Sequence, residues 1–323
     1  MTESAFLAGI DDRERDAARL LTTLVGGLVL GLVAATCGML LVMVAYAILI
    51  GEGTRGAAVL AEIARAVADP QAMAPGLSVL RLVLATAVDG VFLVVFVAVA
   101  AVIMRRTLHT YVTAAPRVRW RLLGVAMALA AAAMAPVVMA EHLLIAGGAA
   151  PPVLGVSPMP GDRLAYALSA LLLLPAAAAE ELFFRGWLLR QTGAFLRRPA
   201  ILIGVTSVLF SAMHLDFNPD AFLTRALMGA GLAYMTLRLG GIEFAAGVHA
   251  VNNMLIVLFL QPLSLQQTEA PDISAFSLFE DIALIGGYVL ITELVARVGP
   301  LRRLAGVRLD EVSRPQDFSA HFS

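Results

Sequence analysis

The sequence contains no lysine and a single cysteine, and charged residues occupy only 15% of its 323 positions. Its basic residues are therefore all arginine, which together with the excess of alanine indicates a GC-rich genome. With one thiol, Cys37, the chain can form neither an intrachain disulfide nor a thiolate metal site. We expect Cys37 to be a packed, unreactive thiol, because it falls in an apolar run. The formal net charge of −1 gives no indication of nucleic-acid binding.

Hydrophobic residues, in contrast, are in large excess. They make up 60% of the chain, and the mean hydropathy is +0.86. A soluble protein of this length could not cover so much apolar surface, so the composition predicts an all-α, polytopic membrane protein. The first apolar run, 20–50, is far longer than the core of a signal peptide and has no clear cleavage site, so we expect it to be retained as a span.

About eight apolar segments are candidates for transmembrane helices, which need about 20 residues each. The predicted spans are 20–50, 78–104, 121–145, 164–190, 200–215, 221–238, 242–261 and 279–298. Arginines gather in alternate connections, above all in 105–121, whereas the intervening connections are poor in arginine or acidic. This alternation predicts a multi-pass protein of the lipid bilayer with both termini cytoplasmic. The signs of a GC-rich genome favour a bacterial protein, and so an inner-membrane location.

The predicted spans divide the chain into five parts. These are an N-terminal tail at 1–19, helices 1–3 at 20–160, a helical core at 161–262, a loop with the last span at 263–303, and a C-terminal tail at 304–323. Both tails are expected to be polar and cytoplasmic. The connection 51–77 is expected to be an extracytoplasmic loop with a short helix at 57–68.

The fourth predicted span carries two adjacent glutamates, Glu180 and Glu181. A carboxylate at membrane depth is costly, so such groups are rare and usually functional. Two later spans carry His214 and His249, and Asn253 follows one helical turn after His249. At about 1.5 Å per residue, the functional side chains lie roughly 11 to 22 Å from the cytoplasmic ends of their spans. We therefore expect them to share one layer in the cytoplasmic half of the membrane.

The fourth span also contains an arginine that can pair with one of the two glutamates but not with the other. Glu181 and Arg185 are four apart on one helix face and can neutralise each other, which leaves Glu180 without a local partner. The two glutamates are expected to face different partners, because they are about 100° apart around the helix. Pro175 is expected to kink the helix one turn earlier and to free a backbone carbonyl near the site.

These residue types suit the hydrolysis of a peptide bond. A desolvated glutamate holds a proton more tightly, so Glu180 can act as a general base, and His214 can orient the water with it. His249 and Asn253 can donate hydrogen bonds to a developing oxyanion. No serine, threonine or cysteine in these helices stands out as a nucleophile.

Further polar or amphipathic residues lie in apolar surroundings. Asp89, in the second predicted span, is expected either to pair with an arginine or to line a cavity. The segment 216–220 must break the fifth helix before it has crossed, and irregular backbone at that depth has to be buried in protein or to line a wet cavity. A polar cavity beside His214 is therefore a hypothesis. Trp120 and Trp187 are expected to anchor the helices at the membrane interface.

Together, three motifs resemble those of the CPBP family, the CAAX proteases and bacteriocin-processing enzymes also called the ABI family. They are Glu-Glu-x-x-x-Arg at 180–185, Phe-x-x-x-His at 210–214 and His-x-x-x-Asn at 249–253, within residues 164–261. The family includes intramembrane endopeptidases of the Rce1 type, multi-helix proteins with a cavity open to the cytosol. The resemblance implies Glu180 as the catalytic base, His214 as its partner, His249 with Asn253 as the oxyanion hole, and structural roles for Glu181 and Arg185.

For the cofactor, the substrate and the activity, the sequence leaves more than one hypothesis open. No cofactor is expected, but Glu180, His214 and His249 have the ligand types of a two-histidine, one-carboxylate zinc site. The expected substrate is a membrane-associated peptide or protein, and a prenylated one is not favoured for a bacterial member. The alternatives are a non-enzymatic membrane protein that keeps the motifs, such as a bacteriocin self-immunity factor or scaffold, and a proton-coupled transporter. The lack of an obvious inverted repeat disfavours the transporter, and the oligomeric state is not indicated.

Overall fold

The computed structural model describes residues 4–50, 75–145, 170–196, 198–260 and 275–313. Within these residues the chain is helical, apart from turns and one isolated bridge between Thr113 and Gly241, so the predicted all-α fold is confirmed. The longer helices are α1 (Ala17–Ile50), α3 (Pro75–Ile103), α5 (Trp120–Ile145), α10 (Pro199–Ala212), α11 (Pro219–Leu239), α12 (Glu243–Leu255) and α13 (Ala275–Arg297). The shorter ones are α4 (His109–Val112), α8 (Leu173–Glu181), the π-helix η2 (Leu182–Leu188), α9 (Leu189–Gly193), the π-helix η3 (Ile256–Leu260), α14 (Gly299–Ala305) and the 3-10 helix η4 (Leu309–Glu311).

The predicted spans are helical where the structure describes them, but fewer have the length and composition to cross a membrane. Those that do are Ala17–Ala45, Thr86–Ile103, Trp120–Ala140 and Glu243–Leu260. Another is added if Asp281–Arg297 and Gly299–Ala305, which meet at 92°, count as one bent span. The described residues therefore form a helical membrane bundle with four or five such spans. The short helix expected at 57–68 lies outside the described residues.

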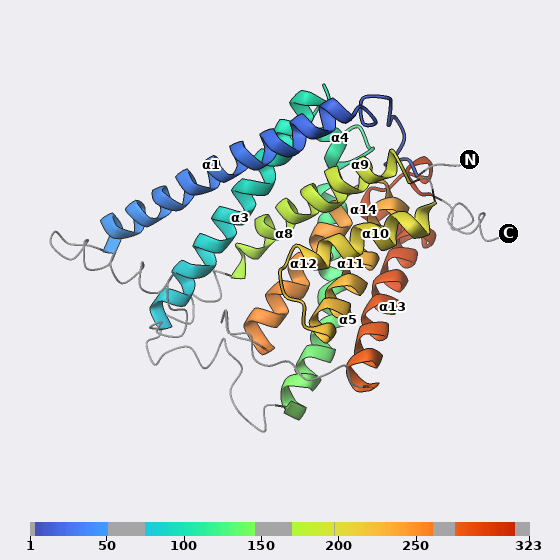
Figure 1. Cartoon of the computed structure of the whole chain (residues 1–323). Coiled ribbons are helices and arrows are strands. Elements are labelled where there is room, and N and C mark those ends of the chain that lie inside the picture. The colour runs from blue at the N-terminus through green and yellow to red at the C-terminus, as the bar shows by residue number, and fades with distance from the viewer. Residues whose placement is uncertain (1–3, 51–74, 146–169, 197, 261–274, 314–323) are drawn as a thin grey trace.

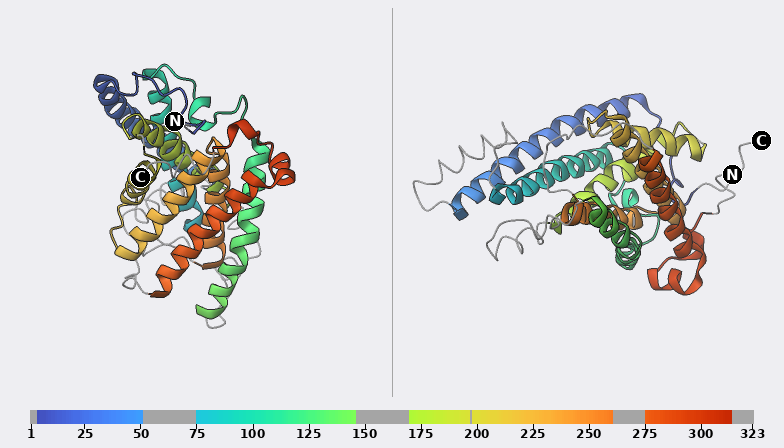
Figure 2. Two further views of the ribbon diagram at one scale, coloured as in Figure 1. Left: turned by 90° about the vertical axis from the view of Figure 1, so that its right-hand side faces the viewer. Right: turned by 90° about the horizontal axis from the view of Figure 1, so that it is seen from below.

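The helices form two groups that are joined through α8 (Figure 1). α1 and α3 pack along each other on one side, whereas α5, α11, α12 and α13 gather on the other. α8 contacts both α3 and α12 and so lies between the groups. The two further views show the same arrangement (Figure 2). Much of α1 is left exposed, including Leu21, Leu32 and Leu41, as suits contact with lipid.

α12 is the central helix of the second group. It packs against α5, α8 and α11, and its residues from Glu243 to Asn252 are all buried. A Cβ at Gly247 would lie 2.8 Å from both the Cβ of Ala126 and the carbonyl oxygen of Leu123, so only glycine allows α5 to approach this closely. The polar side chains of α12 are thus carried on a firmly packed helix.

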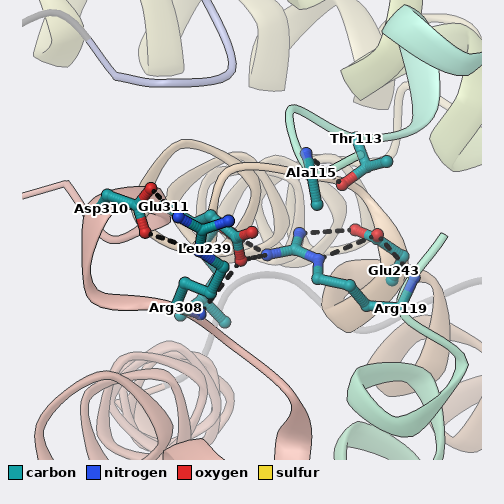
Figure 3. Close-up of polar contacts among 8 residues, drawn as sticks. All are labelled: Thr113, Ala115, Arg119, Leu239, Glu243, Arg308, Asp310 and Glu311. Carbon is teal, nitrogen blue, oxygen red and sulfur yellow. Dashed lines mark hydrogen bonds and ion pairs between the residues drawn. The ribbon is translucent and has the colours of Figure 1, made fainter. Parts of the chain in front are cut away.

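A buried arginine fastens the start of α12 to neighbouring segments (Figure 3). Arg119 donates to the Glu243 carboxylate through Nε at 3.0 Å and Nη2 at 2.8 Å, the two-pronged geometry that favours arginine. Its Nη1 donates to the carbonyl oxygen of Leu239 at 2.7 Å and to Glu311 Oε2 at 3.2 Å. All three charged side chains are buried. We call Arg119, Glu243 and Glu311 the polar clasp.

The N-terminal segment, expected to be a polar tail, is packed against the bundle from Ser4 onward. Phe6 is fully buried, and the Arg190 side chain of α9 donates to its carbonyl oxygen. Ser4 Oγ donates to the carbonyl oxygen of Leu237 at 2.6 Å, and Ser313 Oγ donates to the same oxygen at 2.9 Å. Both ends of the described chain therefore meet at the carboxyl-terminal end of α11.

The structure contradicts two expectations about apolar packing. Trp187 is buried rather than interfacial, because its ring packs against Phe96 and Phe183 at centroid distances of 4.7 and 5.3 Å. Cys37 is exposed rather than packed, because α1 lies at the edge of the bundle, against α3. Trp120 is exposed at the start of α5, which is compatible with an interfacial position.

Candidate functional site

Glu180 and Glu181 end α8 and are followed directly by the π-helical segment η2. Pro175 lies in the first turn of α8. Because proline has no N–H, it cannot donate to the carbonyl of Leu171, and that carbonyl was expected to be free. The Leu171 oxygen accepts from the N–H of Leu174 at 3.2 Å, so that part of the expectation is wrong. The helix becomes irregular after the glutamates instead, at the π-helical segment η2. π-helical turns are rare in proteins overall, but many of those that occur lie at functional sites.

Three charged or titratable side chains are buried together behind Glu180. Glu181, Arg185 and His249 are each at most 2% exposed. Glu181 Oε1 contacts Arg185 Nη1 and His249 Nδ1, each at 2.8 Å. Arg185 Nη2 also donates to the carbonyl oxygen of Gly229 at 3.1 Å, which ties the group to α11. We call Glu181, Arg185 and His249 the buried trio; the ion pair within it was expected, but its contact with His249 was not.

The contact with Glu181 orients the His249 ring. An ionised carboxylate only accepts hydrogen bonds, so we infer that Nδ1 carries a proton and donates it. Nε2 then faces Glu180, whose Oε2 lies 3.8 Å away, at ion-pair rather than hydrogen-bond distance. The two glutamates therefore approach one imidazole from its two nitrogens. The expectation that they would face different partners is wrong, because a side chain from α12 enters between them.

His214 approaches from the end of α10. α10 ends at Ala212, and α11 starts at Pro219 with Asn218 as its N-cap, so the expected break at 216–220 is confirmed. His214 Nδ1 donates to the carbonyl oxygen of Phe210 at 2.8 Å, which in the neutral ring leaves the Nε2 lone pair to accept. The His214 side chain is exposed and lies within electrostatic range of Glu180.

Phe210 joins His214 to the buried trio. Its ring, 1% exposed, packs edge-on against His214 and His249 at centroid distances of 4.8 and 6.1 Å. The Arg185 guanidinium carbon lies 4.3 Å from the centre of the same ring, as in a cation–π contact. The sequence contains a signal for the first contact, since Phe210 and His214 are four apart, but no signal for the others.

Asn253 is less closely tied to this group. It is half-buried, and its Oδ1 accepts from Asn252 Nδ2 at 3.2 Å, while Asn252 Oδ1 faces the Tyr288 hydroxyl at 3.4 Å. Within the described part of the chain, no hydrogen bond joins Asn253 to the histidines or to Glu180. The structure therefore brings Glu180 and both histidines together, with Asn253 one turn beyond His249.

The zinc alternative concerns Glu180, His214 and His249. Among the described residues, no three His, Cys, Asp or Glu side chains are grouped as the ligands of one metal ion. The Nδ1 atoms of His249 and His214 are engaged by Glu181 and by the Phe210 carbonyl, which leaves the two Nε2 atoms for other contacts.

Comparison with known proteins gives a family match and one uncharacterised relative. Residues 162–255 match the family model described as type II CAAX prenyl endopeptidase Rce1-like. The chain is also 28% identical, over 185 residues, to the uncharacterised protein YyaK of Bacillus subtilis (strain 168). That alignment covers 54% of this chain and 58% of YyaK, so the chain spans little more than half of this curated relative. No solved structure matches the chain.

The matched segment contains all three motifs, and it also contains every residue of the buried trio. We call residues 162–255, which match that model, the Rce1-like segment; the match agrees with the resemblance of the three motifs to the CPBP family.

Proposed function

We propose that this protein is an intramembrane endopeptidase that cleaves a membrane-associated peptide or protein with a water activated by Glu180 and His214. Glu180 takes a proton from the water, whose oxygen attacks the scissile carbonyl. His214 Nε2 accepts the second hydrogen bond of that water and holds it in line. The proton held by Glu180 then passes to the leaving amine as the C–N bond breaks.

The proximity of Glu180 and His249 is the observation that carries this proposal. A half-exposed carboxylate lies 3.8 Å from an imidazole that is itself fixed by a buried ion pair. Such a preorganised donor next to a base is what hydrolysis of an amide requires. The family match supports the same reaction class, since the matched family is one of CAAX endopeptidases.

His249 and Asn253 are proposed to stabilise the tetrahedral oxyanion. Because Nδ1 of His249 donates to Glu181, Nε2 can donate only when the ring is an imidazolium. The Asn253 amide has its oxygen turned toward Asn252, which leaves its NH2 group to donate.

The cellular setting is proposed as a bacterial inner membrane with both termini cytoplasmic. The arginine-rich connections favour this orientation, and the meeting of Ser4 and Ser313 at Leu237 supports placing both ends on one side. The relative YyaK comes from a bacterium.

Cleavage of a membrane peptide library by the purified, reconstituted protein tests the proposal. We expect Glu180→Gln to lower kcat by on the order of 10²- to 10⁴-fold, because it removes the base. We expect His249→Ala and Asn253→Ala each to cost on the order of 10²- to 10³-fold, as for loss of an oxyanion donor. Product peptides are identified by mass spectrometry.

Asp310→Asn is the matched control for removing a carboxylate. Asp310 forms an exposed pair with Arg308, away from the site, and its loss should leave cleavage unchanged. Equal cleavage by the wild type and Glu180→Gln would overturn the role of Glu180 as the base, whereas a wild-type protein without cleavage would favour a non-enzymatic role. A zinc chelator is added to the same assay: we expect cleavage to persist, and its loss with recovery on adding zinc would favour the metal-dependent alternative.

A further inference from the structure

Asp220 and Asp281 are acidic residues for which the proposed reaction has no role. Asp281 is only 5% exposed, and among the described residues its buried Oδ2 has no hydrogen-bond partner. Asp220 is half-buried, and its Oδ1 is buried and unpartnered in the same way. Buried polar atoms in proteins are nearly always paired, so two orphaned carboxylate oxygens call for a ligand.

The two residues lie on facing sides of α11 and α13, which pack side by side (Figure 1). The Thr224 hydroxyl of α11 donates to the Asp281 carboxylate of α13. Seven residues farther along both helices, a Cβ on Gly231 would lie 2.6 Å from Cδ2 of the Tyr288 ring. The helices therefore run parallel and in register. Asp220 lies one turn before Thr224 on the same face of α11, so it points toward the same partner helix.

No cation of the two helices compensates these carboxylates. The helices contain three arginines, Arg225, Arg238 and Arg297. Arg225 gives both of its Nη atoms to Asp216 Oδ2, each at 2.9 Å, and the other two arginines donate to Glu293. Within the described part of the chain, no arginine or histidine forms an ion pair with either carboxylate.

The charges of the two carboxylates also act on each other. Asp281 begins the segment Asp281–Arg297, which belongs to a candidate membrane span. Uncompensated like charges between helices at such a position are costly, and a positive ligand removes the cost.

We propose that Asp220, Thr224 and Asp281 bind a hard divalent cation such as Mg²⁺ between α11 and α13. Carboxylate and hydroxyl oxygens suit such ions, and the Thr224 oxygen keeps lone pairs while it donates its proton to Asp281. Mg²⁺ is usually held by one or two carboxylates and keeps several of its waters, which matches a site with two acidic side chains. Its double charge cancels that of both carboxylates.

The cation ties the start of α11 to the start of α13. α11 begins directly after the helix break that follows His214, so the ion stabilises the bundle next to the candidate functional site. None of its ligands is a proposed catalytic residue, and none belongs to the zinc alternative of Glu180, His214 and His249. The inference therefore goes beyond the proposed function and can be tested without a substrate.

Binding of Mn²⁺ to the purified full-length protein tests the site. Mn²⁺ shares the ligand preference of Mg²⁺, and its EPR signal in solution weakens when it binds. We expect the wild type to bind Mn²⁺ and Mg²⁺ to displace it. Asp281→Asn and Asp220→Asn should each weaken binding by at least on the order of 10-fold, because each removes a charged ligand. A wild type that binds no Mn²⁺, or that releases it to Na⁺ as readily as to Mg²⁺, would overturn the inference.

Two further variants locate the bound ion. Asp310→Asn removes an exposed carboxylate that is paired with Arg308, and it is the matched control that should leave Mn²⁺ binding unchanged. Glu180→Gln should also leave it unchanged. Loss of Mn²⁺ binding in Glu180→Gln, with binding kept in Asp281→Asn, would place the ion in the candidate functional site and overturn the inference.

Thermal unfolding gives a second measurement. At a concentration 100-fold above its Kd, Mg²⁺ should raise the Tm of the wild type by about 5 °C, and it should leave Asp281→Asn unchanged. In EDTA, Asp281→Asn should be at least as stable as the wild type, because one of two like charges is gone. If Mg²⁺ raised both Tm values equally, the ion would not be bound by Asp281 and the inference would be overturned.

Discussion

Glu180 and Glu181 are neighbours in the chain but lie in opposite surroundings. Glu181 is completely buried and shares one oxygen with Arg185 and His249, while Glu180 is half-exposed on the accessible side of the same imidazole. Glu181 Oε2 is buried and, among the described residues, has no hydrogen-bond partner. One carboxylate therefore holds the site together, and the other is left to react.

This difference predicts a separation of stability from activity. Glu181→Gln should lower the free energy of unfolding by about 3–5 kcal/mol, because it leaves the Arg185 guanidinium buried without its counter-ion. Glu180→Gln should change stability by less than about 1 kcal/mol, as expected for a half-exposed side chain. Thermal unfolding in detergent measures both.

A double variant provides the control for this prediction. Glu181→Gln with Arg185→Met removes both charges and should recover much of the lost stability, because no unpaired charge remains. If Glu181→Gln alone were as stable as the wild type, the buried trio would not hold the site as the structure indicates.

At the scale of elements, η2 is the segment that departs most from an ordinary apolar helix. It begins directly after the glutamates and carries Arg185 and Gly186. α4 crosses it so closely that a Cβ on Gly186 would lie 2.5 Å from the carbonyl oxygen of Tyr111. Backbone is less able to move away than a flexible side chain, so this crossing requires glycine. Burial raises the pKa of the Tyr111 hydroxyl to about 12, so it stays neutral at this crossing.

We expect Gly186→Ala to destabilise the protein by about 1–3 kcal/mol, the usual cost of overpacking. It should also reduce cleavage, because η2 carries Arg185 of the buried trio. Gly204→Ala in α10 is the matched control: no atom lies within 4 Å of its added Cβ. That variant should be neutral or slightly more stable, by less than about 1 kcal/mol. Equal melting temperatures for the two variants would contradict the close crossing.

At the scale of the whole molecule, the Rce1-like segment is held from both flanks. Arg119 precedes α5 and Glu311 lies in η4, both outside residues 162–255. Arg119 pairs with Glu243 at the start of α12 and also with Glu311. The N-terminal segment and Ser313 close on the end of α11. The flanking regions therefore position α12, and with it His249, from the outside.

The polar clasp gives the prediction at this scale. Arg119→Gln should lower the free energy of unfolding by about 3–5 kcal/mol, because Glu243 and Glu311 would be left buried and unpaired. Arg119→Lys should lose less stability than Arg119→Gln but should not match the wild type, since an ammonium cannot form the two-pronged contact. Arg308→Gln, which removes an exposed partner of Asp310, should shift stability by less than about 0.5 kcal/mol. Similar unfolding curves for Arg119→Gln and Arg308→Gln would contradict the clasp.

The sequence by itself determined the all-α membrane class of the protein and where most of its helices lie, and it predicted the residues of the candidate site. Hydropathy and helical spacing are local properties, so apolar runs, the pair Glu181–Arg185 and the helix break at 216–220 could be read directly. The chemistry expected of Glu180 and His214 likewise followed from residue type and from the cost of burying charge.

Only the tertiary structure decided which side chains meet. Glu181 and His249 are 68 residues apart, so no spacing along the chain reveals their contact. The packing of Phe6 and Trp187 was likewise missed, because the identity of an apolar side chain does not say whether lipid or protein will cover it. Partners in a membrane bundle are selected by close packing and by the need to pair buried charges, and both act between segments that the sequence keeps far apart.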